Sequence, residues 1–148
     1  MTGSLPGRRH GRWLRRQPVA ATLPFGYFGA STGAAAAPWA AAASPRPPVA
    51  AVVSRGGRPD LVSRRLALVQ VPTLLVVGGA DEVVLGLNRQ AQEQLRCENR
   101  LAVIPGATHL FEEPGVLEQV ATRRTQARCP AAAPLVIRVR WISQDRGL

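Results

Sequence analysis

The feature that most constrains the fold is a series of short apolar runs separated by segments of helical pattern. The clearest run, at residues 73–77 (TLLVV), is unbroken, so as a strand it would place apolar side chains on both of its faces. Two glycines follow it. Runs that are apolar on both faces are typical of parallel sheets covered by helices on either side. Strands that alternate with helices form βαβ units with right-handed crossovers. The sequence therefore predicts an α/β fold, with a parallel sheet of about four strands and flanking helices.

The predicted elements follow this alternation along the chain. We expect strands at residues 24–28, 48–54, 73–77 and 100–104. We expect helices at residues 8–16, 32–43, 61–66 and 84–95, and a last one beginning around residue 114. Pro38 lies inside the alanine-rich helix, where a proline kinks a helix or costs about 3 kcal/mol.

The chain of 148 residues is long enough for one domain with a modest core. We divide it into a basic N-terminal segment with a short helix at residues 1–22 and an α/β domain at residues 23–126. Residues 127–148 form a divergent tail in which the alternating pattern ends.

The formal net charge of +10 raises the question of a nucleic-acid partner. All 19 basic residues are arginines, and those outside the N-terminal segment are scattered between apolar runs. A phosphate-binding surface gathers its cations on one face, often with aromatic side chains between them. We therefore expect solvated arginines and no nucleic-acid partner, and keep a basic nucleic-acid-binding module as an alternative.

Metal and cofactor signals are weak. Cys97 and Cys129 lack a CxxC partner, and His10 and His109 are too few and too far apart for a zinc site. We expect neither a metal nor a cofactor. No disulfide is predicted from two lone thiols.

The targeting signals favour a cytoplasmic protein. Residues 17–45 carry no charge and follow an arginine-rich start, which is the outline of an export signal. Prolines and glycines interrupt this stretch, whereas a membrane span needs about 20 apolar residues without such breaks. We expect cytoplasmic residence and no membrane association, with export as the alternative.

The segment GASTG at residues 29–33 matches the GxSxG pattern between a predicted strand and a predicted helix. This context predicts a nucleophile elbow, in which small flanking residues permit a sharp turn and expose the serine hydroxyl. Ser31 is then the candidate nucleophile, and the backbone N–H of Thr32 is a candidate oxyanion-hole donor. The alternative is a loop serine that caps a helix.

A nucleophilic serine needs a base that is oriented by an acid. Asp81 follows the strongest predicted strand, and His109 follows the next strand by five residues. The carboxyl ends of parallel strands share one edge of the sheet, and the order Ser, Asp, His is the one used by α/β-hydrolases. Taken singly, Asp81 is equally well explained as a helix N-cap, with Glu82 as the alternative acid, and His109 as a surface loop histidine.

The motifs along residues 13–125 resemble the dienelactone-hydrolase-like bacterial branch of the α/β-hydrolase superfamily. The segments that carry the resemblance are FGASTGAAAA, VVSRGGRPDL, PTLLVVGGAD, LNRQAQEQL and VIPGATHLFEEPG. The resemblance implies a catalytic triad of Ser31, Asp81 and His109, and hydrolysis of an ester or related carboxylic derivative through an acyl-enzyme. Some relatives are fused to, or encoded beside, a phosphoribosyltransferase domain. Dienelactone hydrolases proper use a cysteine nucleophile, which argues against dienelactone as the substrate.

The same resemblance bears on how much of the family fold we expect in this chain. The family fold has further strands before the elbow, and one of their loops supplies the second oxyanion donor. We therefore expect the C-terminal half of an α/β-hydrolase, truncated, with its first strand at an open apolar edge that pairs with a second copy or a partner chain.

Two arginines near the predicted site suggest a substrate class. Arg55 and Arg58 lie in the turn SRGGRP after a predicted strand and are candidates to hold an anionic group of an ester-like small molecule. Solvated arginines are the alternative. The leading hypothesis is a serine hydrolase, and its rival is an inactive fragment that acts only by association.

Overall fold

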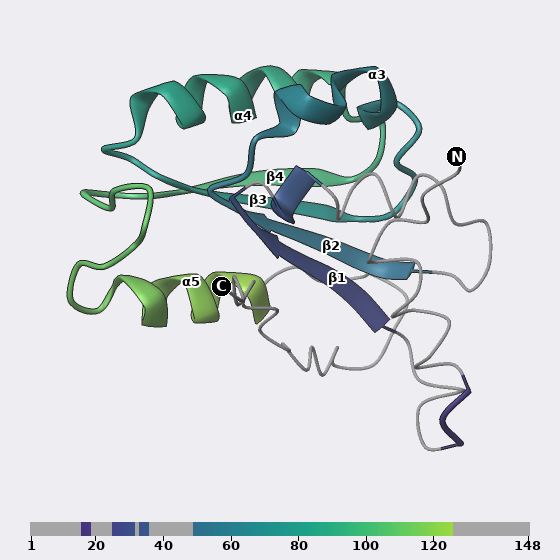
Figure 1. Cartoon of the computed structure of the whole chain (residues 1–148), viewed down its shortest axis with the longest axis horizontal. Helices are drawn as coiled ribbons and strands as arrows, with labels where there is room; N and C mark the ends of the chain where they lie inside the picture. Colours follow the sequence, from purple (N-terminus) through teal and green to yellow (C-terminus); the bar gives the residue numbers. More distant parts are fainter. Residues whose placement is uncertain (1–15, 19–24, 32, 36–48, 126–148) are drawn as a thin grey trace, which may run out of the picture.

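The computed structural model describes residues 16–18, 25–31, 33–35 and 49–125. Figure 1 shows the arrangement of the elements in these segments. In chain order they are β1 (Phe25–Ala30), β2 (Val49–Arg55), the 3-10 helix η1 (Pro59–Val62), α3 (Ser63–Leu66), β3 (Thr73–Gly78), α4 (Glu82–Gln94), β4 (Asn99–Ile104) and α5 (Val116–Thr125).

The strands form one parallel sheet in the order β1-β2-β3-β4. This order places Arg55, at the end of β2, between Ala30 of β1 and Val76 of β3. The predicted fold class, a parallel sheet of four strands with flanking helices, is confirmed. The first strand extends two residues beyond its predicted end at residue 28, because Gly29 and Ala30 still pair with β2.

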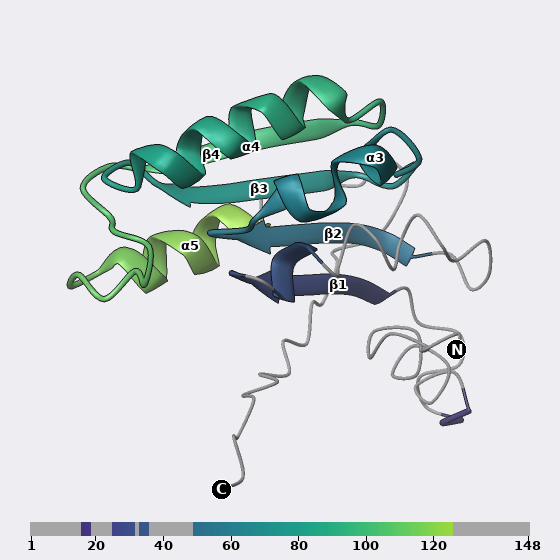
Figure 2. The same cartoon turned by 45° about the horizontal axis from the view of Figure 1, so that its top comes forward.

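Helices cover both faces of the sheet, as Figures 1 and 2 show, with α3 and α4 on one face and α5 on the other. The central strand β3 is buried at all six positions, which explains its unbroken apolar run. The core against α5 contains nine buried side chains: Val53, Leu74, Val76, Ala102, Ile104, Ala107, Phe111, Val116 and Val120. The core against α3 and α4 contains Leu66, Val69, Leu75, Ala91 and Leu95.

Of the two long helices, α4 begins earlier than the sequence predicted and α5 begins later. Helix α4 begins at Glu82, two residues before its predicted start, because Asp81 caps it. Helix α5 begins at Val116, after a turn in which Gly115 has a positive φ. Residues 8–15 of the first predicted helix, most of the predicted helix at 32–43, and the tail at 127–148 lie outside the described residues.

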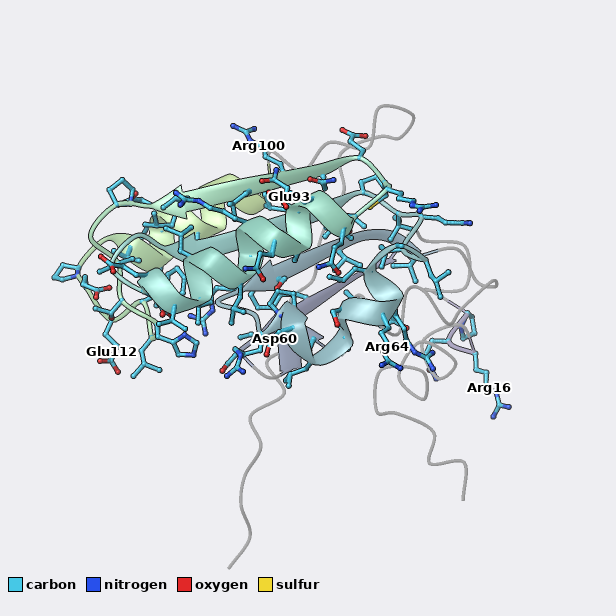
Figure 3. The ribbon with its side chains drawn as sticks, turned by 90° about the horizontal axis from the view of Figure 1, so that it is seen from above. Arg16, Asp60, Arg64, Glu93, Arg100 and Glu112 are labelled. Carbon is cyan, nitrogen blue, oxygen red and sulfur yellow. The ribbon has the colours of Figure 1, made fainter. Side chains whose placement is uncertain are left out.

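The arginines labelled in Figure 3 lie apart from one another on the molecule. In Figure 3 Arg100 on β4 lies at the top of the view, while Arg64 on α3 lies toward the bottom. Within the described segments no helix is long and apolar enough to span a membrane. The cytoplasmic location stays a prediction.

The carboxyl ends of all four strands point to one edge of the sheet because the strands are parallel. The loops that leave β1, β3 and β4 at this edge carry Ser31, Asp81 and His109 respectively. In Figure 1 the loops after β3 and β4 lie together at the left of the molecule. This edge therefore holds the candidate site.

Candidate active site

Ser31 lies at a sharp turn directly after β1. Its backbone φ is 51°, a left-handed conformation that is uncommon for residues other than glycine and that costs about 1–3 kcal/mol. Two hydrogen bonds hold the turn: the Ser31 N–H donates to the Arg55 carbonyl at 3.0 Å, and the Ser31 carbonyl accepts from the Ala34 N–H at 3.1 Å. This is the geometry expected of a nucleophile elbow.

The two glycines of the GxSxG segment differ in how much space surrounds them. A Cβ on Gly29 would lie 2.6 Å from the Ala34 Cα and 2.6 Å from the Gly33 carbonyl oxygen, so only glycine fits there. A Cβ on Gly33 would have no atom of the described residues within 4 Å. The expectation that both flanking positions must be very small therefore holds at Gly29, and the described residues do not require it at Gly33.

His109 contacts both of the other predicted site residues. Its Nε2 lies 3.1 Å from the Ser31 hydroxyl, and its Nδ1 lies 2.7 Å from Asp81 Oδ2. The Asp81 side chain is 15% exposed and that of His109 is 37% exposed, so the acid is the better shielded of the pair. A carboxylate at Nδ1 favours the tautomer that leaves Nε2 free to accept the serine proton.

Asp81 also forms the contact of a helix N-cap, which was the alternative interpretation of this residue from the sequence. Its Oδ1 accepts a hydrogen bond from the Val84 N–H at 3.4 Å and so caps α4. The two interpretations of Asp81 are therefore compatible, because each uses a different carboxylate oxygen. Glu82, the alternative acid, is exposed in the first turn of α4, and the residue that contacts His109 is Asp81.

Backbone hydrogen bonds hold the loop after β4 against the loop after β3. The Gly79 N–H donates to the Ile104 carbonyl at 2.8 Å, and the Ala80 N–H donates to the Ala107 carbonyl at 3.0 Å. Gly78 lies so close to the carbonyl of Ala107 that a Cβ would collide with it. This close approach brings Asp81 and His109 together.

Glu113 supports the His109 loop and was missed in the sequence. Its Oε1 accepts a hydrogen bond from the Thr108 N–H at 2.8 Å. This hydrogen bond lowers the pKa of the Glu113 carboxyl, since it stabilises the charged form. The only signal in the sequence was an acidic residue just before the last predicted helix, where dipole effects gave a sufficient explanation.

Asn88 was also missed, although it anchors the turn after β2. Its side chain is fully buried in α4, and its Nδ2 donates to the Gly57 carbonyl at 2.9 Å and to the Val84 carbonyl at 2.8 Å. A polar residue between the buried Val84 and Ala91 was the available signal. The turn carries Gly56, where an added Cβ would lie 3.4 Å from Phe111 Cε2 and 3.5 Å from the His109 carbonyl oxygen.

The two predicted substrate-binding arginines have different surroundings. Arg58 is exposed and forms a two-point ion pair with Asp60, at 2.9 and 2.8 Å, which raises the pKa of Arg58 and lowers that of Asp60. Arg55 is half-buried, and its guanidinium carbon lies 5.0 Å from the centre of the Phe111 ring. Burial lowers the pKa of Arg55.

The predicted oxyanion donor, Thr32, lies outside the described residues, as do His10 and Cys129. Cys97 has a free thiol. Among the described residues, no three His, Cys, Asp or Glu side chains are grouped so that they could hold a metal ion.

Comparison with known proteins gives a consistent picture of the fold. The chain superposes on a dienelactone hydrolase from Anabaena variabilis with a TM-score of 0.74 and 53% sequence identity, covering 78% of this chain and 53% of that one. It also superposes on a "predicted CIB-like hydrolase" from Thermoplasma acidophilum with a TM-score of 0.60 and 20% identity, covering 78% and 57% of the two chains. At 20% identity the second likeness shows the fold alone.

Two curated relatives come from two strains of Mycobacterium tuberculosis, and each carries the name "Putative phosphoribosyl transferase". Both are 64% identical to this chain over 109 residues, which are 74% of this chain and 24% of the relative. The chain thus spans about a quarter of the length of the curated relatives it matches. No protein-family model matches it.

The parallel sheet and its structural neighbours define an α/β-hydrolase fold. Within that class, the chain resembles the dienelactone-hydrolase-like branch, as the sequence motifs indicated. The likeness covers 53% of the Anabaena chain, so it concerns part of that fold.

Proposed function

We propose that this chain carries the nucleophile, base and acid of a serine hydrolase that acts on an ester or a related carboxylic derivative. One observation carries the proposal. A continuous series of hydrogen-bond distances links the Ser31 hydroxyl to His109 Nε2 at 3.1 Å, and His109 Nδ1 to Asp81 at 2.7 Å. Each partner comes from a loop at the same sheet edge, and the serine lies on a strained turn.

The proposed reaction proceeds in two halves. The Ser31 oxygen attacks the carbonyl carbon of the ester while His109 Nε2 accepts the serine proton. The tetrahedral intermediate then breaks its bond to the alcohol oxygen, and His109 returns the proton to that leaving group. The product of the first half is an acyl ester on Ser31.

Water completes the cycle in the second half. His109 accepts a proton from water as the water oxygen attacks the acyl carbon, and the bond to the Ser31 oxygen breaks. His109 then returns the proton to Ser31, and a carboxylic acid is released. Asp81 stabilises the imidazolium in both halves and fixes the imidazole tautomer.

Charge that develops on the carbonyl oxygen needs hydrogen-bond donors. We propose the Thr32 backbone N–H as one donor, because it directly follows the nucleophile in sequence. In comparable enzymes the removal of one such donor lowers the rate by about 10²–10³.

The name of the solved neighbour supports this proposal, whereas the names of the curated relatives indicate a different activity. The solved neighbour at 53% identity is a dienelactone hydrolase, which supports hydrolysis. The curated relatives are named for phosphoribosyl transfer, but this chain matches only 24% of their length. The site geometry of this chain favours acyl transfer, so we propose hydrolysis for it.

The experiment is hydrolysis of p-nitrophenyl acetate and butyrate by the wild-type chain, the Ser31→Ala variant and the control Ser63→Ala. Ser63 is an exposed serine at the start of α3. We expect turnover by the wild type and Ser63→Ala, and its loss in Ser31→Ala. Equal activity in all three would overturn the assignment.

A folded wild-type chain without turnover would instead favour the two alternative functions. An inactive fragment that acts by association would elute from size-exclusion chromatography as a larger species or as a complex. A nucleic-acid-binding module would bind DNA or RNA with steep salt dependence, which removal of residues 1–16 would reduce.

A further inference from the structure

Phe111 has a strained backbone that the proposed reaction does not explain. Among the described residues, two that are not glycine have a positive φ: Ser31, at 51°, and Phe111, at 59°. The first lies at the nucleophile turn, and the sharp bend there accounts for it. A left-handed backbone is an outlier for a bulky side chain, and such residues cluster at functional sites, where the surrounding structure holds them. Because Phe111 follows the proposed base, His109, by two residues, its strain belongs to the loop that carries the base.

The turn that carries His109 is closed by Phe111 at one end. The Phe111 N–H donates to the Thr108 carbonyl at 3.4 Å, so His109 and Leu110 are the two central residues of a four-residue turn. The other end is fastened as well, because the Thr108 N–H donates to Glu113 Oε1 at 2.8 Å. The position of the imidazole therefore depends on where Thr108 and Phe111 are held.

The Phe111 side chain fastens this turn to the core. Between residues 105 and 115 two side chains below the nucleophile edge are fully buried, those of Ala107 and Phe111, and both belong to the core against α5. They lie two residues before and two residues after His109, whereas Leu110 is 60% exposed. The Phe111 ring is much the larger of the two buried groups, and the Arg55 guanidinium carbon lies 5.0 Å from its centre. The ring is therefore the main packed anchor of the loop.

The Phe111 ring and the imidazole also lie close to the same point of the sheet edge. A Cβ added to Gly56 would lie 3.4 Å from Phe111 Cε2 and 3.6 Å from His109 Cε1, both ordinary van der Waals distances. Gly56 is fixed to the sheet, because its N–H donates to the Val76 carbonyl at 2.7 Å. A shorter side chain at position 111 thus opens space near the imidazole.

We propose that Phe111 is a positioning residue of the hydrolytic reaction, whose buried ring and strained turn hold His109 where the imidazole reaches both Ser31 and Asp81. The reaction needs both distances, 3.1 Å to the serine hydroxyl and 2.7 Å to the carboxylate. The His109 side chain is itself 37% exposed, so its own packing leaves part of this restraint to the turn. A misplacement of about 1 Å costs about 10²-fold in rate. The inference rests on the hydrolase function proposed above and names a residue that acts through its base.

The kinetic test compares the wild type, Phe111→Ala, Phe111→Leu and the control Val120→Ala on p-nitrophenyl butyrate. Val120 belongs to the same core cluster but lies on α5. At a temperature where all four chains are folded, we expect kcat of Phe111→Ala to fall about 10- to 100-fold while KM stays within a few-fold. Phe111→Leu keeps an apolar anchor and so shows a smaller loss, and Val120→Ala keeps the kcat of the wild type. If Phe111→Ala does not fold, the comparison of Phe111→Leu with Val120→Ala decides in its place.

A spectroscopic measurement separates positioning from a general loss of core packing. The chain has two histidines, His10 and His109, so ¹⁵N-histidine labelling in a His10→Gln background reports on His109. The Nδ1 proton of His109 gives a low-field NMR signal while it is hydrogen-bonded to Asp81, and Asp81→Ala identifies that signal by removing it. We expect the signal in the wild type and in Val120→Ala, and its loss or broadening in Phe111→Ala.

An unchanged kcat or an unchanged NMR signal in Phe111→Ala, or an equal loss of kcat in Val120→Ala, would overturn the inference and leave the hydrolase function intact. The absence of turnover in a folded wild type would overturn the hydrolase function instead. The NMR comparison then decides the role of Phe111 separately, because it requires no substrate. A signal that Phe111→Ala loses and Val120→Ala keeps supports the positioning of His109 by Phe111, and any other result overturns it.

Discussion

Asp81 orients His109 with one carboxylate oxygen and caps its own helix with the other. Oδ2 lies 2.7 Å from His109 Nδ1, while Oδ1 accepts the Val84 N–H at 3.4 Å. The proposed acid is therefore also part of the framework that fixes the start of α4. Stability and activity can be separated at this residue because the two contacts have different chemical requirements.

The first prediction uses that separation. Asparagine is as good an N-cap as aspartate, but its neutral amide cannot stabilise the imidazolium and permits the wrong tautomer. We expect Asp81→Asn to unfold in urea within a few tenths of a kcal/mol of the wild type, and to lose about 10³–10⁴ in kcat on p-nitrophenyl esters. Asp81→Ala should lose the same activity and about 1 kcal/mol of stability as well.

Retained activity in Asp81→Asn would contradict this role of Asp81. Glu82→Gln is the matched control, since Glu82 is the adjacent acid in the first turn of α4 and is exposed. We expect its kcat to stay near that of the wild type. A loss of activity in Glu82→Gln alone would make Glu82 the acid.

The second prediction concerns the two glycines that flank Ser31. A Cβ at Gly29 would lie 2.6 Å from backbone atoms of Gly33 and Ala34, whereas a Cβ at Gly33 would have no described atom within 4 Å. We expect Gly29→Ala to destabilise the chain by about 1–3 kcal/mol and to displace the serine turn, with loss of esterase activity. Gly33→Ala should fold normally and retain activity.

Thermal unfolding and ester hydrolysis of the two variants test this contrast. If Gly29→Ala were as stable and active as the wild type, the elbow would have more space than these distances give. If Gly33→Ala were the more damaging change, the second glycine would be required by contacts with other parts of the chain.

The third prediction concerns Asn88, which fastens the turn after β2 to α4. Its buried Nδ2 donates to the Gly57 carbonyl at 2.9 Å. Asn88→Leu keeps the branched shape of the side chain but leaves that carbonyl without its donor, so we expect a loss of about 1–3 kcal/mol in the free energy of unfolding by urea. The control Gln90→Leu changes an exposed residue of the same helix and should stay within about 0.5 kcal/mol.

An unchanged stability of Asn88→Leu would mean that the Gly57 carbonyl finds another donor. A loss in both variants alike would point to a general effect of leucine on α4.

Much of the site was predictable because its members each follow an apolar strand. The strand at Thr73–Gly78 and the GASTG turn are local signals, and parallel pairing then brings Ser31, Asp81 and His109 to one edge. The supporting residues were not predictable in this way. Asn88 and Glu113 act through the carbonyl of Gly57 and the N–H of Thr108, and a sequence does not show which backbone groups are left unpaired.

Arg55 and Arg58 illustrate the same limit. Both lie in the SRGGRP turn and were equivalent candidates in the sequence. The structure separates them because a nearby carboxylate, Asp60, pairs with Arg58, while Phe111 lies under Arg55. The ion pair is formed by residues two positions apart, but the aromatic contact spans more than one strand and depends on the tertiary fold.

The last prediction concerns pH and the loop that carries His109. The hydrogen bond from the Thr108 N–H stabilises the Glu113 carboxylate and lowers its pKa below the ordinary value of about 4.3. A carboxyl group with a lowered pKa in the folded state contributes stability that is fully present above its unfolded pKa and is lost as the pH falls through its folded pKa. Glu113→Gln keeps an acceptor oxygen at this position but has no proton to gain.

We therefore expect the stability of the wild type to exceed that of Glu113→Gln by a constant amount at neutral pH, and this difference to shrink below about pH 5. Urea unfolding at a series of pH values measures it. Glu112→Gln, at the exposed neighbouring residue, controls for the loss of one negative charge. A difference between the wild type and Glu113→Gln that does not change in acid would show that the contribution of the Thr108 hydrogen bond does not depend on the carboxylate charge.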